Sequence, residues 1–150
     1  MSVKVPNTYA EWVTVLDMLK NKENDEAVLE AMLQGTIEWQ VGVAERFAKR
    51  LIDTINERMN SATEKFQKEI NRSQGQERAL IQALVSLRKE LKFLSQAIRL
   101  PALPEKDREH YYNLVKEQAD KIQESLEDSA KHDRTGKLAS LIRNNKVNNF

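Results

Sequence analysis

The sequence contains no cysteine, which excludes disulfide bonds and thiolate metal ligands. A reducing compartment is therefore the simpler expectation, and we predict a cytoplasmic protein. Residues 1–8 lack an apolar run of signal-peptide length, and no segment approaches the roughly 18 apolar residues of a membrane span. We therefore expect a soluble protein with no membrane span.

Glycine and proline are also scarce, with four and three positions among 150 residues. A β-sandwich or a β-barrel would need more turn residues than this. The composition, 40% hydrophobic and 31% charged, is typical of helices with narrow apolar stripes and broad solvated faces. The length suits one ordinary domain. We predict an all-α protein whose residues 1–150 form a single domain.

The common signatures of catalysis are missing from the sequence. It has no glycine-rich phosphate loop and no G-x-S-x-G motif. The two histidines, His110 and His132, do not form the repeated Glu-x-x-His pattern of metal sites in helical bundles. We predict surface or capping roles for both histidines, no cofactor, and no enzymatic activity.

The longest regular pattern runs from Thr36 to about Asn71. Apolar residues recur there every three or four positions, at Ile37, Val41, Ala44, Ala48, Leu51, Ile55, Met59, Ala62, Phe66 and Ile70. This spacing predicts one helix with a single apolar stripe, about 50 Å long at about 1.5 Å per residue. We expect Gly35 to be the C′ cap of the preceding helix and Thr36 to be the N-cap of the long one.

One feature leaves the continuity of this long helix open. Residues 61–64 (Ser-Ala-Thr-Glu) match a capping box, so the helix could break near Asn60 and begin again. Such residues also occur on exposed faces of unbroken helices. We favour an unbroken helix.

Two short helices are predicted before it. Residues 8–11 (Thr-Tyr-Ala-Glu) form a capping box at the start of the first helix, whose apolar face we assign to Trp12, Val13, Leu16 and Leu19. The second short helix has its apolar face at Val28, Leu29, Met32 and Leu33.

Two further long helices follow the stretch from Thr36. The first carries a coiled-coil seam with four-three spacing at Leu80, Leu84, Leu87, Leu91, Leu94 and Ile98. Pro101 and Pro104 predict a corner. The next helix, ending near Lys131, has apolar positions at Tyr111 or Tyr112, Val115, Ala119, Ile122 and Leu126. With a short helix over residues 137–143, the pattern predicts an antiparallel bundle of three long helices, two short N-terminal helices and a short C-terminal helix.

Residues 134–150 form a basic, partly flexible C-terminal segment with four cations and no acidic residue: Arg134, Lys137, Arg143 and Lys146. These cations could dock on the chain's own acidic helix, which carries Glu117, Asp120, Glu124 and Asp128. They could also contact nucleic-acid phosphates or an acidic partner protein. We favour docking or simple solubility, and we expect the asparagine-rich end to be frayed.

The long helix from Thr36 is longer than the helices that follow it, so these helices leave part of its apolar stripe uncovered. A second copy of the chain would cover it, and we predict a homodimer with Trp39, Phe66 and Ile70 at the interface. In the alternative, the two short N-terminal helices fold back over the gap. We expect Gly42 to mark a close helix approach.

The leading hypothesis for function is a non-enzymatic helical-bundle protein that binds another protein or itself, for example as an adaptor, regulator or assembly factor. The alternative is a nucleic-acid-associated protein that uses the basic C-terminal segment together with Arg78, Arg88, Lys89 and Lys92. A metal-dependent nucleotide hydrolase is third.

The third hypothesis depends on two acidic pairs, Glu23 with Glu26 and Glu117 with Asp120. Their spacing resembles the E-x-x-E and E-x-x-D motifs through which all-helical nucleotide pyrophosphatases bind magnesium. The first pair straddles a predicted loop and lies far from the second, so we interpret both pairs as solvated helix faces.

Overall fold

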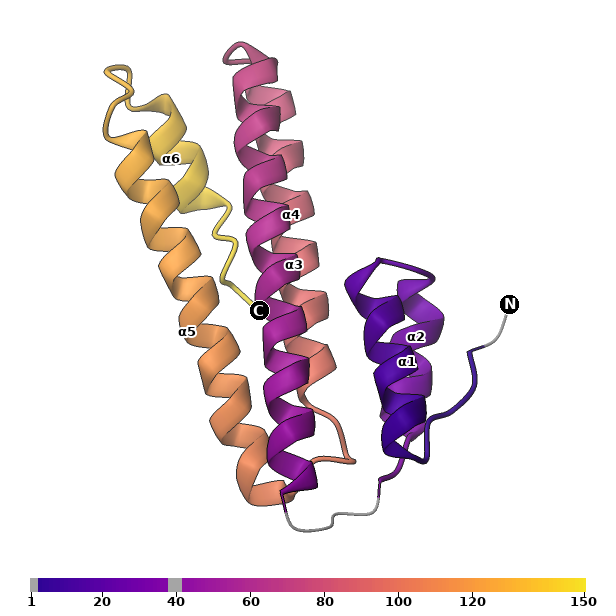
Figure 1. The fold of residues 1–150 in the computed structure, drawn as a ribbon. Coiled ribbons are helices and arrows are strands. Elements are labelled where there is room, and N and C mark those ends of the chain that lie inside the picture. The colour runs from indigo at the N-terminus through magenta and orange to yellow at the C-terminus, as the bar shows by residue number, and fades with distance from the viewer. Residues whose placement is uncertain (1–2, 38–41) are drawn as a thin grey trace. The chain divides into compact units, whose positions relative to one another are not determined.

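The computed structural model describes residues 3–37 and 42–150, and helices are its dominant secondary structure (Figure 1). Of the described residues, 76% are helical and none belongs to a strand, which confirms the all-α prediction. The described helices are α1 (Tyr9–Lys20), α2 (Asp25–Gln34), α3 (Val43–Ser73), α4 (Glu77–Ile98), α5 (Glu105–Ala130) and α6 (Lys137–Asn144). No helix in these two ranges combines the length and the apolar character that a membrane span requires.

The chain divides into two compact units. The first contains residues 1–58 and 95–115, and the second contains residues 59–94 and 116–150. The long helices α3, α4 and α5 each contribute residues to both units. The single domain over residues 1–150 stays a prediction.

Helix α3 is continuous over 31 residues and passes Asn60 without a break, as we favoured. Its start differs from the prediction, because Thr36 and Ile37 are not helical and α3 begins at Val43. Thr36 is therefore not an N-cap. Gly42 precedes α3 with a φ of +80°, and a Cβ there would meet no atom within 4 Å, so this glycine serves a turn and not a close helix approach.

Thr36 is held by the N-terminal segment instead. Its N–H donates to the Pro6 carbonyl at 3.0 Å, and its hydroxyl donates to Asn7 Oδ1 at 3.0 Å. Its own carbonyl accepts a hydrogen bond of 2.9 Å from the indole nitrogen of Trp12. Because its backbone and hydroxyl groups bind residues far away in the sequence, they are not available to cap a helix.

Gly35 is required by packing and not by a left-handed cap. Its φ of −70° and ψ of 155° are extended, so the predicted C′ conformation is wrong. A Cβ at this position would lie 2.5 Å from Trp12 Cζ2 and 2.9 Å from the Pro6 carbonyl oxygen. Trp12 is fully buried and packs edge-on against Phe47, with 4.9 Å between the two ring centroids. It therefore cannot move aside easily.

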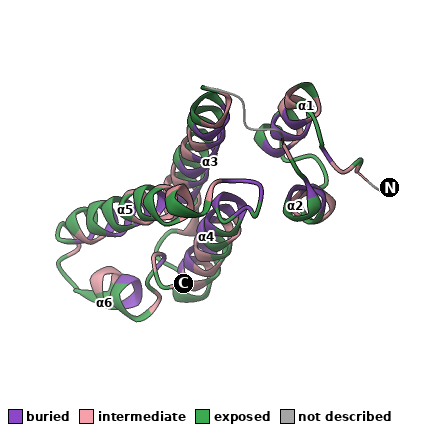
Figure 2. Ribbon diagram, turned by 90° about the horizontal axis from the view of Figure 1, so that it is seen from below, coloured by how far each residue is buried: buried purple, intermediate pink, exposed green. Residues whose placement is uncertain are grey.

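Helices α1 and α2 pack against each other through short apolar faces (Figures 1 and 2). The buried side chains are Trp12, Val15, Leu16 and Leu19 on α1, and Val28, Ala31 and Met32 on α2. Leu33, which we assigned to the α2 face, is 43% exposed. The buried face of α2 therefore includes Ala31 and not Leu33. Hydropathy alone ranks alanine below leucine, so it favoured the wrong position.

A buried arginine joins these two helices to α3. The guanidinium of Arg58 is 2% exposed and contacts both carboxylate oxygens of Asp25 at 2.9 Å. The same group donates to the Leu19 carbonyl at 3.0 Å. One side chain of α3 therefore binds the last turn of α1 and the first residue of α2.

The long helices bury most of the stripe positions that their periodicity predicts, although Ala44 and Ile70 of α3 are only partly buried. All six seam residues of α4 are buried, as are Val115, Ala119, Ile122 and Leu126 on α5 and Leu141 and Ile142 on α6. Tyr111 and Tyr112 are partly exposed. The apolar spacing thus located the buried face of each of these helices (Figure 2).

Replacing Gly35 by alanine tests the close contact at Trp12. We expect Gly35→Ala to lower the free energy of unfolding by about 2 to 3 kcal/mol, because the new methyl group overpacks a filled site. The control is Gly136→Ala, where a Cβ meets no atom within 4 Å and only the positive φ of 72° is strained. We expect Gly136→Ala to lower the free energy of unfolding, measured in urea, by about 1 kcal/mol. Equal losses for the two variants would contradict the packing role of Gly35.

Replacing Arg58 tests the contact among α1, α2 and α3. We expect Arg58→Ala to cost roughly 3 to 5 kcal/mol, because the Leu19 carbonyl and the Asp25 carboxylate lose their buried partner. Arg58→Lys should recover only part of this, since an ammonium group cannot bind a carboxylate in the bidentate geometry. The double variant Arg58→Met/Asp25→Leu should unfold at a higher urea concentration than Arg58→Ala. A double variant less stable than Arg58→Ala would contradict this interpretation.

Candidate interaction site

The N-terminal segment, residues 3–7, forms one wall of a groove on the first unit. The hydrogen bonds from Thr36 fix this segment at Pro6 and Asn7. Nearer the N-terminus, Lys4 forms an ion pair of 2.5 Å with Glu11 on α1. The segment is thus attached to the hairpin of α1 and α2 at two points, and Val3 lies beyond the second point.

The capping box at the start of α1 fixes Glu11. The Glu11 N–H donates to the Thr8 hydroxyl at 3.2 Å, which confirms Thr8 as the N-cap. The Glu11 carboxylate in turn accepts the Asn7 N–H at 3.2 Å. The hydrogen bond to Lys4 and this backbone bond lower the pKa of Glu11, so its charged form is favoured.

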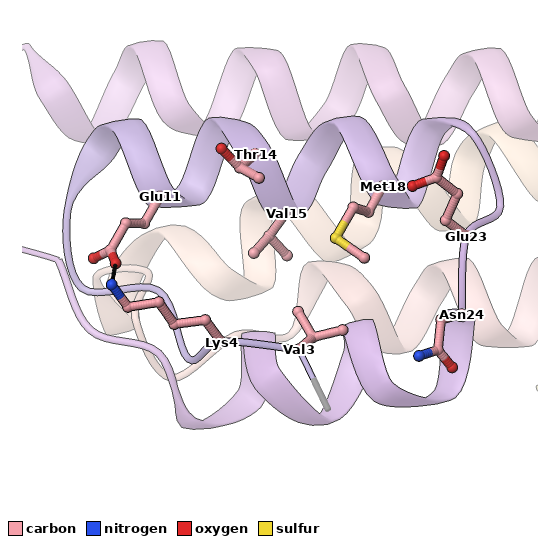
Figure 3. Close-up of a pocket in the computed structure, with 8 residues that line it drawn as sticks. All are labelled: Val3, Lys4, Glu11, Thr14, Val15, Met18, Glu23 and Asn24. Atoms are coloured by element: carbon pink, nitrogen blue, oxygen red, sulfur yellow. Dashed lines mark ion pairs between the residues drawn. The ribbon is translucent and has the colours of Figure 1, made fainter. Parts of the chain in front are cut away.

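The groove itself, which we call the α1 groove, has a volume of about 550 Å³. It is lined by Val3, Lys4, Glu11, Thr14, Val15, Met18, Glu23 and Asn24 (Figure 3). Val15 and Met18 project from α1 toward Val3, so the middle of the groove is apolar. The ion pair of Lys4 and Glu11 closes one end, and Glu23 and Asn24 lie at the other.

The end at Glu23 is formed by a tight turn. Lys22 and Asn24 both have left-handed backbones, with φ of 57° and 56°. Hydrogen bonds from Glu23 N–H to the Met18 carbonyl at 3.0 Å and from Lys22 N–H to the Leu19 carbonyl at 3.3 Å close the end of α1. Arg58 of α3 also donates to the Leu19 carbonyl, so this turn is fixed by a side chain of α3 as well as by its own backbone hydrogen bonds.

The charge around the α1 groove is acidic. Residues 1–35 contain three basic and six acidic residues, a net charge of −3. The Glu23 carboxylate is exposed and has no partner among the described residues, whereas Glu11 is paired with Lys4. A positively charged group of a ligand would therefore be favoured at the Glu23 end.

The predicted basic residues Arg134, Lys137, Arg143 and Lys146 belong to the second unit. Lys137 forms an ion pair of 3.5 Å with Glu77 of α4, and both side chains are more than half exposed. Arg134, Arg143 and Lys146 are exposed and form no ion pair within the described part of the chain. Of the two roles that we favoured, docking of these three cations on the acidic helix is not found among the described residues, and simple solubility stays a prediction.

The C-terminal end does dock on α5, but through uncharged residues. Val147 is fully buried, and its N–H donates to Gln123 Oε1 at 3.0 Å. The side-chain amide of Asn148 donates to Asp120 at 2.8 Å. The expectation of a frayed end is thus wrong for these two residues.

Asp133 is a residue that our sequence analysis did not single out. Its carboxylate accepts the N–H groups of Leu138 at 3.0 Å and Thr135 at 3.2 Å, and the Thr135 hydroxyl at 2.9 Å. These bonds, with that from Leu138 first, lower the pKa of Asp133. The Asp-x-Thr spacing before α6 is the signal that would have identified this cap.

The three predicted interface residues have different environments. Trp39 lies outside the described residues. Phe66 is 2% exposed, so its burial does not require a second copy. Ile70 is partly exposed and borders a second cavity of about 350 Å³ together with Leu80 and Leu138. Homodimer formation stays a prediction.

The acidic pairs of the hydrolase hypothesis lie on different elements. Glu23 is in the turn before α2, whereas Glu117 and Asp120 lie on α5. Within residues 3–37 and 42–150, no three histidine or acidic side chains come close enough to hold a metal ion together.

Comparisons with known proteins give no assignment. No protein-family model matches the chain, and no significant similarity to a curated protein or to a solved structure was found.

The α1 groove was missed by the sequence analysis. Val15 and Met18 occupy ordinary helical positions, and Val3 precedes the first helix by several residues. The sequence has no local signal that residues 3–7 return to Thr36, because that contact joins residues about 30 positions apart.

Proposed function

We propose that this protein is a non-enzymatic interaction protein, an adaptor or regulator, that binds an amphipathic helix of a partner protein in the α1 groove. The observation that supports this proposal is the apolar middle of the groove between two polar ends. Helix-binding grooves of proteins have this organisation, in which apolar anchors enter the middle and polar groups set the orientation.

The side chains of the groove favour a helix as the ligand. Val3, Val15 and Met18 offer aliphatic surface, and methionine adapts its shape to different apolar anchors. The volume of about 550 Å³ accommodates a few large side chains presented at helical spacing. The left-handed turn at Lys22 and Asn24 keeps one end of the groove in place before a ligand arrives.

The charge of the groove selects the partner's chemistry. The Glu23 carboxylate, which has no partner among the described residues, and the net charge of −3 over residues 1–35 favour a helix with at least one lysine or arginine beside its apolar anchors. Such a pair contributes more to association rate and orientation than to affinity.

A defined peptide pair tests this proposal. The probes are fluorescein-labelled helices of about 18 residues, long enough to be helical, with leucine at helical spacing and either lysine or glutamate at one end. We expect the lysine peptide to bind the full chain with a dissociation constant in the range of about 1 to 100 μM, and the glutamate peptide to bind about tenfold more weakly.

Variants of the chain locate the site in the same anisotropy measurement. Met18→Glu should weaken the lysine peptide at least about tenfold, and Glu23→Lys should remove the preference for lysine over glutamate. The matched control is Leu33→Glu, which places the same charge on an exposed leucine outside the groove. Equal weakening by Met18→Glu and Leu33→Glu, or no binding of either peptide at 1 mM (about 1,000-fold above 1 μM), would end the proposal.

We infer that the long helices form an antiparallel, coiled-coil-like bundle that carries these sites. Three residues, 74–76, connect α3 to α4, and six residues, 99–104, connect α4 to α5. Connections this short favour antiparallel neighbours, and the four-three seam of α4 favours coiled-coil packing.

Nucleic-acid binding is a second candidate, because Arg134, Arg143 and Lys146 are exposed and unpaired among the described residues. If these cations contact phosphates, the chain should shift DNA or RNA in a gel at about 50 mM salt, and the shift should weaken steeply as salt rises. Replacing Arg134, Lys137, Arg143 and Lys146 by glutamine should then remove the shift. The same variant should keep its stability within about 1 kcal/mol, because only the exposed pair of Lys137 and Glu77 is lost. A wild-type chain that causes no shift at low salt eliminates this candidate.

A further inference from the structure

We propose that the face of α5 around Lys116, Asp120 and Gln123 is a peptide-binding site that residues 147–150 fill in cis and from which they can be displaced. The ligand class is a non-helical peptide with an aliphatic residue, an asparagine and, two positions later, an aromatic residue. This site belongs to the second unit and does not depend on the α1 groove.

The first reason is that α5 binds main-chain groups of the tail. Gln123 Oε1 accepts the N–H of Val147 at 3.0 Å, and the ammonium group of Lys116 donates to the carbonyl of Asn148. Side chains on one helix face therefore bind an N–H and a C=O of consecutive residues in a segment that is itself neither helix nor strand. Main-chain recognition of a non-helical segment is one of the ways in which proteins bind peptides.

The second reason is that the acceptor on α5 is held in place. The Gln123 side chain is 4% exposed, and its amide nitrogen donates to Glu127 on the next turn at 3.2 Å. That bond points the amide oxygen toward the tail. A buried, oriented acceptor loses little freedom when a peptide binds, so the site is preorganised.

The third reason is that three side chains of the tail have separate contacts. Val147 is fully buried, Asn148 donates to Asp120 at 2.8 Å, and Lys116 lies over the Phe150 ring at 4.4 Å from its centre. Asn149 is exposed. The contacts thus define a pattern of Val-Asn-x-Phe, in which the third position is free to vary.

The tail is attached in a way that permits its release. Helix α6 ends at Asn144 with its own cap, because the Asn145 N–H donates to the Leu141 carbonyl at 3.0 Å. Lys146, which precedes Val147, is exposed. Residues 147–150 can therefore leave α5 while α6 stays folded. A tethered tail has an effective concentration on the order of 1 mM, so an external peptide binds well only when the tail is weakened.

The test uses the full chain with Val147→Asp and Phe150→Ala, which should release the tail. The probe is a fluorescein-labelled peptide with the sequence of residues 144–150 (Asn-Asn-Lys-Val-Asn-Asn-Phe). We expect this peptide to bind the released chain and to bind the wild-type chain at least about tenfold more weakly, because the cis tail competes. Gln123→Ala in the released chain should remove binding, whereas the control Glu124→Ala, an exposed neighbour, should not. No binding to the folded, released chain overturns the proposal.

Hydrogen exchange of the wild-type chain provides a second test that needs no variant. If the tail is displaceable, the Val147 amide should exchange through local opening at least about 100-fold faster than the amides of Ala119 and Ile122 on α5. A Val147 amide that exchanges as slowly as those of α5 would mean that residues 147–150 are a fixed part of the core, and it would overturn the proposal.

Discussion

The buried guanidinium of Arg58 is the constraint on which the first unit depends. A cation that is 2% exposed requires acceptors, and here they are the carboxylate at the start of α2 and a carbonyl at the end of α1. Helix starts favour carboxylates and helix ends favour cations, so all three partners also suit the helix dipoles. Because these acceptors flank the turn at Lys22 and Asn24, Arg58 also fixes the polar end of the α1 groove.

The two proposed sites recognise their ligands by different physical means. The α1 groove offers aliphatic side chains between charged ends, so a ligand must present its own side chains at helical spacing. The face of α5 instead offers Gln123 to an N–H and Lys116 to a C=O, so a ligand must have free main-chain groups. A helix satisfies its own backbone groups and cannot use the second site, whereas a non-helical peptide cannot place its side chains at helical spacing along the first.

Local signals in the sequence predicted the features that residues near each other determine. The capping box at Thr8, the seam of α4 and the continuity of α3 past Asn60 each involve groups no more than one or two turns apart. The start of α3 and the role of Gly35 were not predictable in this way. Threonine is a common N-cap, so the local sequence also suited a helix that begins after Thr36. The hydrogen bonds of Thr36 with Pro6, Asn7 and Trp12 favour its non-helical conformation instead. The α1 groove depends on that same long-range contact, and so it was missed as well.

The C-terminal segment shows which forces determine its position. The sequence suggested that four cations would hold it to acidic α5, yet exposed ion pairs contribute only about 0 to 1 kcal/mol each. Burying one valine contributes roughly 1.5 to 3 kcal/mol, and Val147 is fully buried. Hydrogen bonds that Val147 and Asn148 donate to Gln123 and Asp120 then fix the direction of the tail. Apolar burial and hydrogen bonds of uncharged tail residues therefore position this segment. Since Arg134, Arg143 and Lys146 are not needed for it, their charge can act on a partner without a cost to the fold.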